Sequence, residues 1–145
     1  MGLSFCIPVN RVMNEEVISI APTCSLAEAD QILREARIRH LPVVDEGNRL
    51  VGLLSNRNML IAHFSSKDQD GRRVAAHIMS RDLITVSPKT CLCVVGELLF
   101  ENKIGCAPVV DKKGHLLGII TESDFVRITY TGHRCEDADA ALPSE

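Results

Sequence analysis

Short apolar runs, bounded by proline, glycine and polar turn residues, recur along the chain and have the length of β-strands. Residues 17–20 and 83–86 are rich in β-branched side chains, and a proline follows each run two residues later. Such runs between turn signals are typical of strands. The pattern predicts six strands, at residues 17–20, 41–45, 50–54, 83–86, 107–111 and 116–120.

Segments whose apolar residues recur at helical spacing lie between these predicted strands. Ser25 and Glu28 form a capping-box pattern, in which each side chain bonds the other residue's backbone N–H at a helix start. Apolar residues then recur at positions 26, 29, 33 and 36, and their counterparts stand at 92, 95 and 99. Two more helices are predicted over residues 56–64 and 122–130, and a short one within residues 72–79.

The two halves of the chain are copies of one unit. A shift of 66 positions aligns Pro42 with Pro108 and Gly52 with Gly118, without a gap, together with most apolar positions. The predicted order of elements in each copy is βαββα. A unit of about 50 residues buries too little apolar surface to be stable alone. We therefore expect an α/β fold in which two repeats pack with pseudo-twofold symmetry and share one core. The predicted boundaries are repeats at 12–64 and 74–130, a linker at 65–73 and a disordered tail at 131–145.

Composition and charge exclude several functions. The net charge of −3 argues against a binder of nucleic acid, which needs clustered cations. Aromatic residues make up 3% of the chain and tryptophan is absent, so no base-stacking platform is expected. No apolar run reaches the roughly 20 residues that span a bilayer, and no signal peptide is recognisable. These features predict a cytoplasmic protein that binds neither nucleic acid nor membrane.

Cysteine and histidine spacing predicts neither a metal site nor a catalytic centre. Cys91 and Cys93 lack a second pair or a histidine at ligand spacing. Cys24, Cys93 and Cys106 are interpreted as small hydrophobic residues, and a redox role for Cys91 and Cys93 stays open as the alternative. The five histidines show no ligand spacing, and no nucleophile stands with a base, so an enzyme is not predicted. They are His40, His63, His77, His115 and His133.

Candidate chemistry lies where the last strand of each repeat meets its last helix. Thr121 and Asp124 stand three residues apart at the second junction, and Ser55 and Asn58 at the first. Such residues cap a helix. A helix N-terminus also attracts phosphate, and a carboxylate one turn later suits two vicinal ribose hydroxyls. Asn58 offers one acceptor oxygen, which makes the first junction the weaker ribose site. From the residues alone, capping and nucleotide binding remain equal alternatives.

The duplicated motifs resemble the tandem cystathionine-β-synthase (CBS) domain pair, or Bateman module, over nearly the whole chain. The resemblance rests on Leu-Pro-Val-Val-Asp at residues 41–45, Ala-Pro-Val-Val-Asp at 107–111, and a Gly-x-x-Ser/Thr-x-x-Asn/Asp junction after each. Met13 and Met79 lead into the two copies. It implies a non-catalytic sensor that binds an adenine nucleotide between its repeats, without an obligatory cofactor, and signals to an effector protein. AMP is the expected ligand, with ATP, ADP and NAD as alternatives.

The resemblance also implies two sites and a homodimer of CBS pairs. The preferred site comprises Thr85, Val86, Ile104, Gly105, Cys106, Ala107, Pro108, Thr121 and Asp124. The weaker site comprises Ser19, Ile20, His40, Leu41, Pro42, Ser55 and Asn58. A module that only dimerises or docks on a partner, without a physiological nucleotide, is the alternative function.

Overall fold

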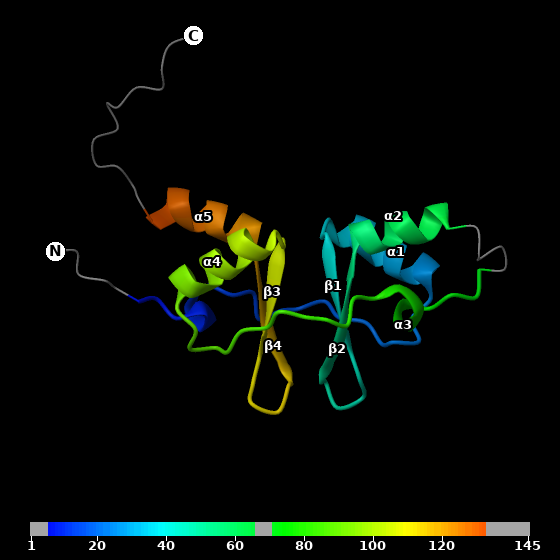
Figure 1. Cartoon of the computed structure of the whole chain (residues 1–145), viewed down its shortest axis with the longest axis horizontal. Helices are drawn as coiled ribbons and strands as arrows, with labels where there is room; N and C mark the ends of the chain where they lie inside the picture. The colour runs from blue at the N-terminus through cyan, green and yellow to red at the C-terminus, as the bar shows by residue number, and fades with distance from the viewer. Residues whose placement is uncertain (1–5, 66–70, 133–145) are drawn as a thin grey trace, which may run out of the picture.

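The two repeats form two similar halves of the molecule. The computed structural model describes residues 6–65 and 71–132 (Figure 1). Repeat 1 contains α1 (Leu26–Ala36), β1 (His40–Val44), β2 (Leu50–Ser55) and α2 (Asn56–Phe64). Repeat 2 contains α4 (Leu92–Asn102), β3 (Cys106–Val110), β4 (Leu116–Thr121) and α5 (Glu122–Gly132). The short elements η1 (Val9–Arg11) and α3 (Ala75–Ile78) precede the first long helix of each repeat, α1 and α4, and the predicted α/β class is confirmed.

Each repeat is built on one antiparallel hairpin. In repeat 1, His40 pairs with Ser55, and in repeat 2 Cys106 pairs with Thr121. The register shifts at the equivalent place in both hairpins, between Val43 and Val44 and between Val109 and Val110. The hairpins face each other at the centre of the molecule, with the helices to either side (Figure 1). This equivalence is the pseudo-twofold symmetry that the repeat predicts.

The hairpin turns tie the two repeats together. The Leu50 N–H donates to the Gly114 carbonyl, and the Leu116 N–H donates to the Asn48 carbonyl, both at 3.0 Å. The Asn48 side-chain amide donates to the Leu116 carbonyl at 3.1 Å. These bonds hold the hairpins against each other at their turn ends.

The predicted strands at residues 17–20 and 83–86 are wrong. Each reduces to a single parallel bridge, Ile20 with Val43 and Val86 with Val109. The Ile20 N–H donates to the Pro42 carbonyl, and the Val44 N–H donates to the Ile20 carbonyl. The next bond of a parallel ladder would need an N–H on Pro42, which proline lacks. Pro108 has the same effect beside Val86, so neither run can extend.

The segment that leads into each repeat packs on the other repeat. Val9 is fully buried in a cluster with Val95, Val109 and Ile120 of repeat 2. Its equivalent, Ala75, is fully buried in the cluster of repeat 1. In Figure 1, η1 accordingly lies beside α4, and α3 lies beside the hairpin of β1 and β2. The expected single shared core is therefore wrong, because each repeat has its own cluster, completed by the other repeat's leading segment.

The repeated glycines explain how these leading segments fit. A Cβ on Gly118 would lie 2.6 Å from the Met13 sulfur and 3.0 Å from the Asn14 carbonyl oxygen. A Cβ on Gly52 would lie 2.7 Å from Cγ of Met79. Glycine at these two positions lets the methionine segments cross the hairpins at close range.

Helix ends and cysteine positions differ in part from the predictions. Helix α5 continues to Gly132, two residues into the predicted tail, and residues 133–145 lie outside the described ones. Of the linker at 65–73, Ser65 and residues 71–73 are described. Cys106 is buried as predicted, whereas Cys93 is exposed because it faces solvent on the first turn of α4. Within the described residues, no helix combines the length and apolarity required to cross a membrane.

Candidate functional site

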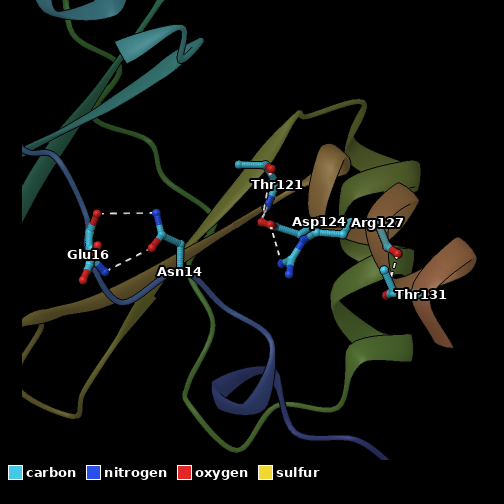
Figure 2. Close-up of polar contacts among 6 residues, drawn as sticks. All are labelled: Asn14, Glu16, Thr121, Asp124, Arg127 and Thr131. Atoms are coloured by element: carbon cyan, nitrogen blue, oxygen red, sulfur yellow. Dashed lines mark hydrogen bonds and ion pairs between the residues drawn. The ribbon is translucent and has the colours of Figure 1, made fainter.

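The second junction holds a network centred on Asp124. One carboxylate oxygen of Asp124 accepts the Thr121 N–H at 2.8 Å and the Thr121 hydroxyl at 3.2 Å. The other oxygen accepts from the Arg127 guanidinium at 3.1 Å (Figure 2). The Asp124 side chain is 17% exposed. The carboxylate therefore caps α5 and is held at a fixed place one turn into the helix.

The first junction is a complete capping box. The Asn58 N–H donates to the Ser55 hydroxyl at 3.2 Å, and the Ser55 N–H donates to the Asn58 side-chain oxygen at 2.9 Å. The Ser55 hydroxyl also donates to that oxygen at 2.6 Å. The Asn58 amide nitrogen donates to the Ser80 hydroxyl at 3.3 Å. The side-chain oxygen of Asn58 and one of its amide N–H groups are thus already engaged in hydrogen bonds to Ser55 and Ser80.

Each junction opens into a cavity between the repeats. The Asp124 cavity has a volume of about 400 Å³ and is lined by Thr121 and Asp124 on one side. Its apolar wall comes from repeat 1, through Val17, Ile18, Ile38 and Pro42. Both volume and mixed lining are typical of small-molecule sites, which measure roughly 300–1,000 Å³.

The Asn58 cavity is the symmetric counterpart, with a volume of about 520 Å³. Ser55 and Asn58 face an apolar wall from repeat 2, which includes Ile84, Ile104 and Pro108. Every residue that lines the Asp124 cavity has an equivalent in the Asn58 cavity, 66 positions away in the sequence. The two cavities are thus equivalent sites that differ in chemistry.

This arrangement corrects the predicted grouping of site residues. The prediction combined each junction with the strands of its own repeat, but each junction faces the strands of the other repeat. Ile104, Gly105, Cys106 and Pro108 line the Asn58 cavity, and Gly105 lines both. His40 lines both cavities, and Pro42 lines the Asp124 cavity. The reason is the pseudo-twofold packing, which sets each hairpin face against the other repeat's junction.

Several predicted residues belong to the core instead. Ile20, Leu41, Val86 and Ala107 are buried in the two hydrophobic clusters. Ser19 and Thr85 are not among the described residues that line either cavity. Their neighbours Ile18 and Ile84 line the cavities in their place. An alternating strand pattern could not reveal this, because these segments are not regular strands.

Charges differ between the two cavities. The Asp124 cavity is lined by Arg37 and Arg39 as cations, against Glu16, Glu122 and Asp124 as anions. The Asn58 cavity is lined by Arg39, Arg57 and Lys103 against Asp82 and Glu122. The sequence interpretation missed Arg37, Arg39 and Lys103, because single surface cations carry no pattern. Either cavity can offer a cation to a phosphate group, but only the Asp124 cavity offers a carboxylate at the N3 position of the helix.

His40 lies on the wall between the two cavities. A Cβ on Gly105 would approach its Cε1 atom to 2.8 Å, so the imidazole requires glycine at that position. Burial lowers the pKa of His40, although Glu122 opposes that shift. The ring is therefore neutral at pH 7 and can act as a hydrogen-bond donor or acceptor.

A third cavity, of about 550 Å³, lies between α1 and α2 and contains neither Thr121 nor Ser55. Within residues 6–65 and 71–132, no cluster of three or more His, Cys, Asp or Glu side chains is arranged for a metal ion. The junction residues of the two repeats thus lie in the other two cavities.

Known proteins show the same repeated unit. The family model named CBS domain matches residues 9–64 and 74–130. The chain belongs to the CBS domain family. CBS pairs are generally regulatory modules without catalysis of their own.

The inosine-5'-monophosphate dehydrogenase of Mycobacterium tuberculosis (strain ATCC 25618 / H37Rv) is 35% identical over 130 residues, which are 90% of this chain and 24% of the enzyme. The corresponding enzyme of Bifidobacterium longum is 34% identical over 79% of this chain and 21% of the enzyme. The chain thus spans a minor part of these relatives.

Solved CBS pairs match nearly the whole chain. CBSX2, a CBS-pair protein from Arabidopsis thaliana, was also solved in complex with AMP. That complex is 29% identical with a TM-score of 0.78, and the match covers 86% of this chain and 96% of CBSX2. The CBS pair of protein MJ0100, in complex with 5'-methylthioadenosine and S-adenosyl-L-methionine, is 26% identical with a TM-score of 0.78. That match covers 89% of this chain and all of the other, 100%.

Proposed function

We propose that the chain is a regulatory module that binds an adenine nucleotide in the Asp124 cavity and transmits the bound state to a partner protein. One observation carries the proposal. A capped helix N-terminus, a fixed carboxylate and an aliphatic wall converge on one cavity of about 400 Å³. These are the three chemical features that a nucleotide requires.

Each part of a nucleotide has a counterpart in the cavity. The Asp124 carboxylate accepts from the two vicinal ribose hydroxyls, since it has two oxygens. The phosphate lies at the N-terminus of α5, near the Thr121 hydroxyl, where backbone N–H groups and the helix dipole favour an anion. The adenine ring lies against Ile18, Ile38 and Pro42.

The charges of the cavity favour AMP over ADP, ATP and NAD. Two arginines face three carboxylates there, so the cavity has no excess of positive charge. One phosphate can be accommodated beside Arg37 and Arg39, but each further phosphate adds repulsion from Glu16 and Glu122. The complex of CBSX2 with AMP supports this choice, since it has the same fold. The Asn58 cavity has more cations but lacks the ribose carboxylate, so it is the weaker site for an adenine nucleotide.

A thermal unfolding experiment tests the function. AMP at about 100 times its Kd stabilises the folded state by about 2.7 kcal/mol, which for a chain of this size raises Tm by about 5–10 °C. We expect 2'-deoxy-AMP to give a clearly smaller shift, because it lacks one hydroxyl that Asp124 accepts. Absence of a shift with AMP, ADP, ATP or NAD at millimolar concentration would overturn nucleotide binding and leave the interaction module.

We further propose that two such modules form a homodimer through their helices. Large apolar side chains are exposed on α2, α4 and α5, including Phe64 at 78%, Phe100 at 82% and Tyr130 at 66%. Exposed large apolar side chains are a common feature of protein interaction sites. The same observation favours the alternative function, a module that only docks on a partner.

Light scattering on the purified protein tests the homodimer. We expect twice the chain mass of 15.9 kDa, and a shift towards the monomer mass when Phe64 and Tyr130 are both changed to serine. Leu117→Ser is the control, because Leu117 is an exposed apolar residue on β4 at 38% exposure and not on a helix. A monomer in the unmodified protein, or an equal loss in the control, contradicts the proposed interface.

A further inference from the structure

Three cysteine thiols meet at the start of α4, away from both junction cavities. Cys91 is the N-cap residue of α4, and Cys93 lies on its first turn. Cys6 comes from the segment before η1, which is held against α4 because the Leu92 N–H donates to the Ile7 carbonyl at 2.8 Å. The Cys93 and Cys91 sulfurs are 3.2 Å apart, with Cys93 as the donor. The fold thus assembles a thiol cluster from two distant parts of the chain.

Neither core packing nor helix capping explains this cluster. Cys6 and Cys93 are exposed and Cys91 is partly exposed, whereas Cys106 is buried. Ser25 holds the equivalent N-cap position in repeat 1, and its hydroxyl accepts the Glu28 N–H at 3.1 Å. The Cys91 side chain makes no such capping bond. The thiol is therefore free of the structural task that its counterpart performs.

The cluster concentrates thiolate character on one sulfur. Hydrogen bonds from Cys6 and Cys93 lower the pKa of Cys91 to about 7. Hydrogen bonding to Cys91 raises the pKa of Cys6 to about 11 and also raises the pKa of Cys93. Burial raises the pKa of Cys106 to about 12. At pH 7 a large share of Cys91 is therefore thiolate, the form that reacts with oxidants.

We propose that Cys91 is a hydroperoxide-reactive thiol and that Cys93 resolves its oxidised form as a Cys91–Cys93 disulfide. The site is independent of nucleotide binding, because it shares no residue with either cavity. Its position at the surface gives a small oxidant direct access to the sulfur.

The reaction balances with hydrogen peroxide as the oxidant. The Cys91 thiolate attacks one peroxide oxygen, the O–O bond breaks, and the departing hydroxide takes a proton to become water. The sulfur loses two electrons and becomes a sulfenic acid. The Cys93 thiolate then attacks the Cys91 sulfur, the S–S bond forms, and the S–O bond breaks with release of hydroxide. That hydroxide takes up the Cys93 thiol proton, so the second product is also water.

Cys93 is the resolving residue because of its position. Its sulfur already lies 3.2 Å from Cys91 on the same helix turn, so a small side-chain rotation reaches bonding distance. Cys6 lies on a separate segment and acts through its hydrogen bond to Cys91, which makes it a positioning residue.

Peptide mapping of the full chain tests the proposal. The reduced protein is exposed to hydrogen peroxide at pH 7, alkylated and digested with trypsin. Cleavage after Lys89 and Lys103 leaves both Cys91 and Cys93 on peptide 90–103, whereas Cys6 lies on peptide 1–11. We expect peptide 90–103 to become lighter by two hydrogen atoms and to resist alkylation. Its oxidation is expected to be about fivefold to tenfold faster than that of an exposed thiol with an ordinary pKa, since higher thiolate content outweighs lower nucleophilicity.

Variants separate the roles of Cys91 and Cys93. In Cys93→Ser we expect the Cys91 sulfenic acid to persist and to be captured by dimedone. Cys91→Ser gives α4 the N-cap residue of α1, so it is expected to fold and to lose the rapid oxidation. Cys24→Ser is the matched control and keeps it. Peptide 90–103 that remains a dithiol while other cysteines oxidise overturns the proposal, and a cross-link between peptides 1–11 and 90–103 overturns the assignment of Cys93.

Discussion

Replacing Asp124 by alanine is expected to weaken AMP binding by about 100-fold, which corresponds to about 2.7 kcal/mol. Hydrogen bonds to a charged group contribute about 1.5–3 kcal/mol each, and the proposed site has two of them to the ribose. Part of that energy is offset, because the carboxylate already accepts from Thr121 and Arg127 in the free protein. Isothermal titration calorimetry of the two proteins with AMP measures the difference.

Asn58→Ala is the matched control, at the equivalent position of the other cavity. We expect it to change AMP affinity by less than about threefold, because Asn58 lines the other cavity. A threefold change corresponds to about 0.7 kcal/mol. Both variants lose a capping bond worth about 1 kcal/mol of stability, so a common loss of stability does not explain a difference in affinity. Equal losses of affinity contradict the ranking of the two sites.

A second matched pair tests which wall belongs to which junction. Ile18 lines the Asp124 cavity and Ile84 lines the Asn58 cavity, although each comes from the opposite repeat to the junction it faces. Ile18→Glu places a charge beside the proposed adenine and should weaken AMP binding at least as much as Asp124→Ala does. Ile84→Glu should leave AMP binding intact. The reverse result would restore the grouping within one repeat.

The sequence was sufficient for the helices, the two hairpins and the two junctions, because those depend on local chemistry. The equivalent places of Pro42 and Pro108, the repeated glycines and the capping side chains of Ser55 and Asp124 all follow from residue types at fixed spacing. Residues 17–20 show the limit of this approach. Their β-branched pattern predicts a strand, but whether a strand extends depends on the neighbouring edge, and Pro42 supplies no N–H there.

The sequence could not predict which repeat supplies the apolar wall of each cavity, because that too depends on contacts outside the segment. Ile18 and Ile84 are identical residues in equivalent contexts, so nothing in either segment indicates which junction it faces. That choice depends on how the two repeats dock, through contacts between residues far apart in the sequence. The backbone hydrogen bonds from Leu50 to Gly114 and from Leu116 to Asn48 are such contacts, and no periodic pattern in the sequence predicts them.

The packing of each leading segment on the other repeat also depends on contacts between residues far apart in the sequence. Val9 provides a direct test of this packing. Val9 has no exposed surface and packs in the cluster of repeat 2, although it stands at the start of repeat 1 in the chain. Val9→Ala removes two buried methyl groups, each worth about 0.8 kcal/mol, and leaves a cavity that adds to the loss. We expect the free energy of unfolding to fall by about 2–3 kcal/mol, measured by urea denaturation with the slope unchanged.

Ile7→Ala is the control for that measurement, because Ile7 lies on the same segment but is 43% exposed. It should cost about 1–1.5 kcal/mol, less than Val9→Ala, since its side chain is only partly removed from water in the folded state and leaves no enclosed cavity. If Val9→Ala costs no more than Ile7→Ala, the leading segment does not complete the core of repeat 2. A large difference between the two indicates that the repeats depend on each other for stability, so that neither is a complete folding unit without the other's leading segment.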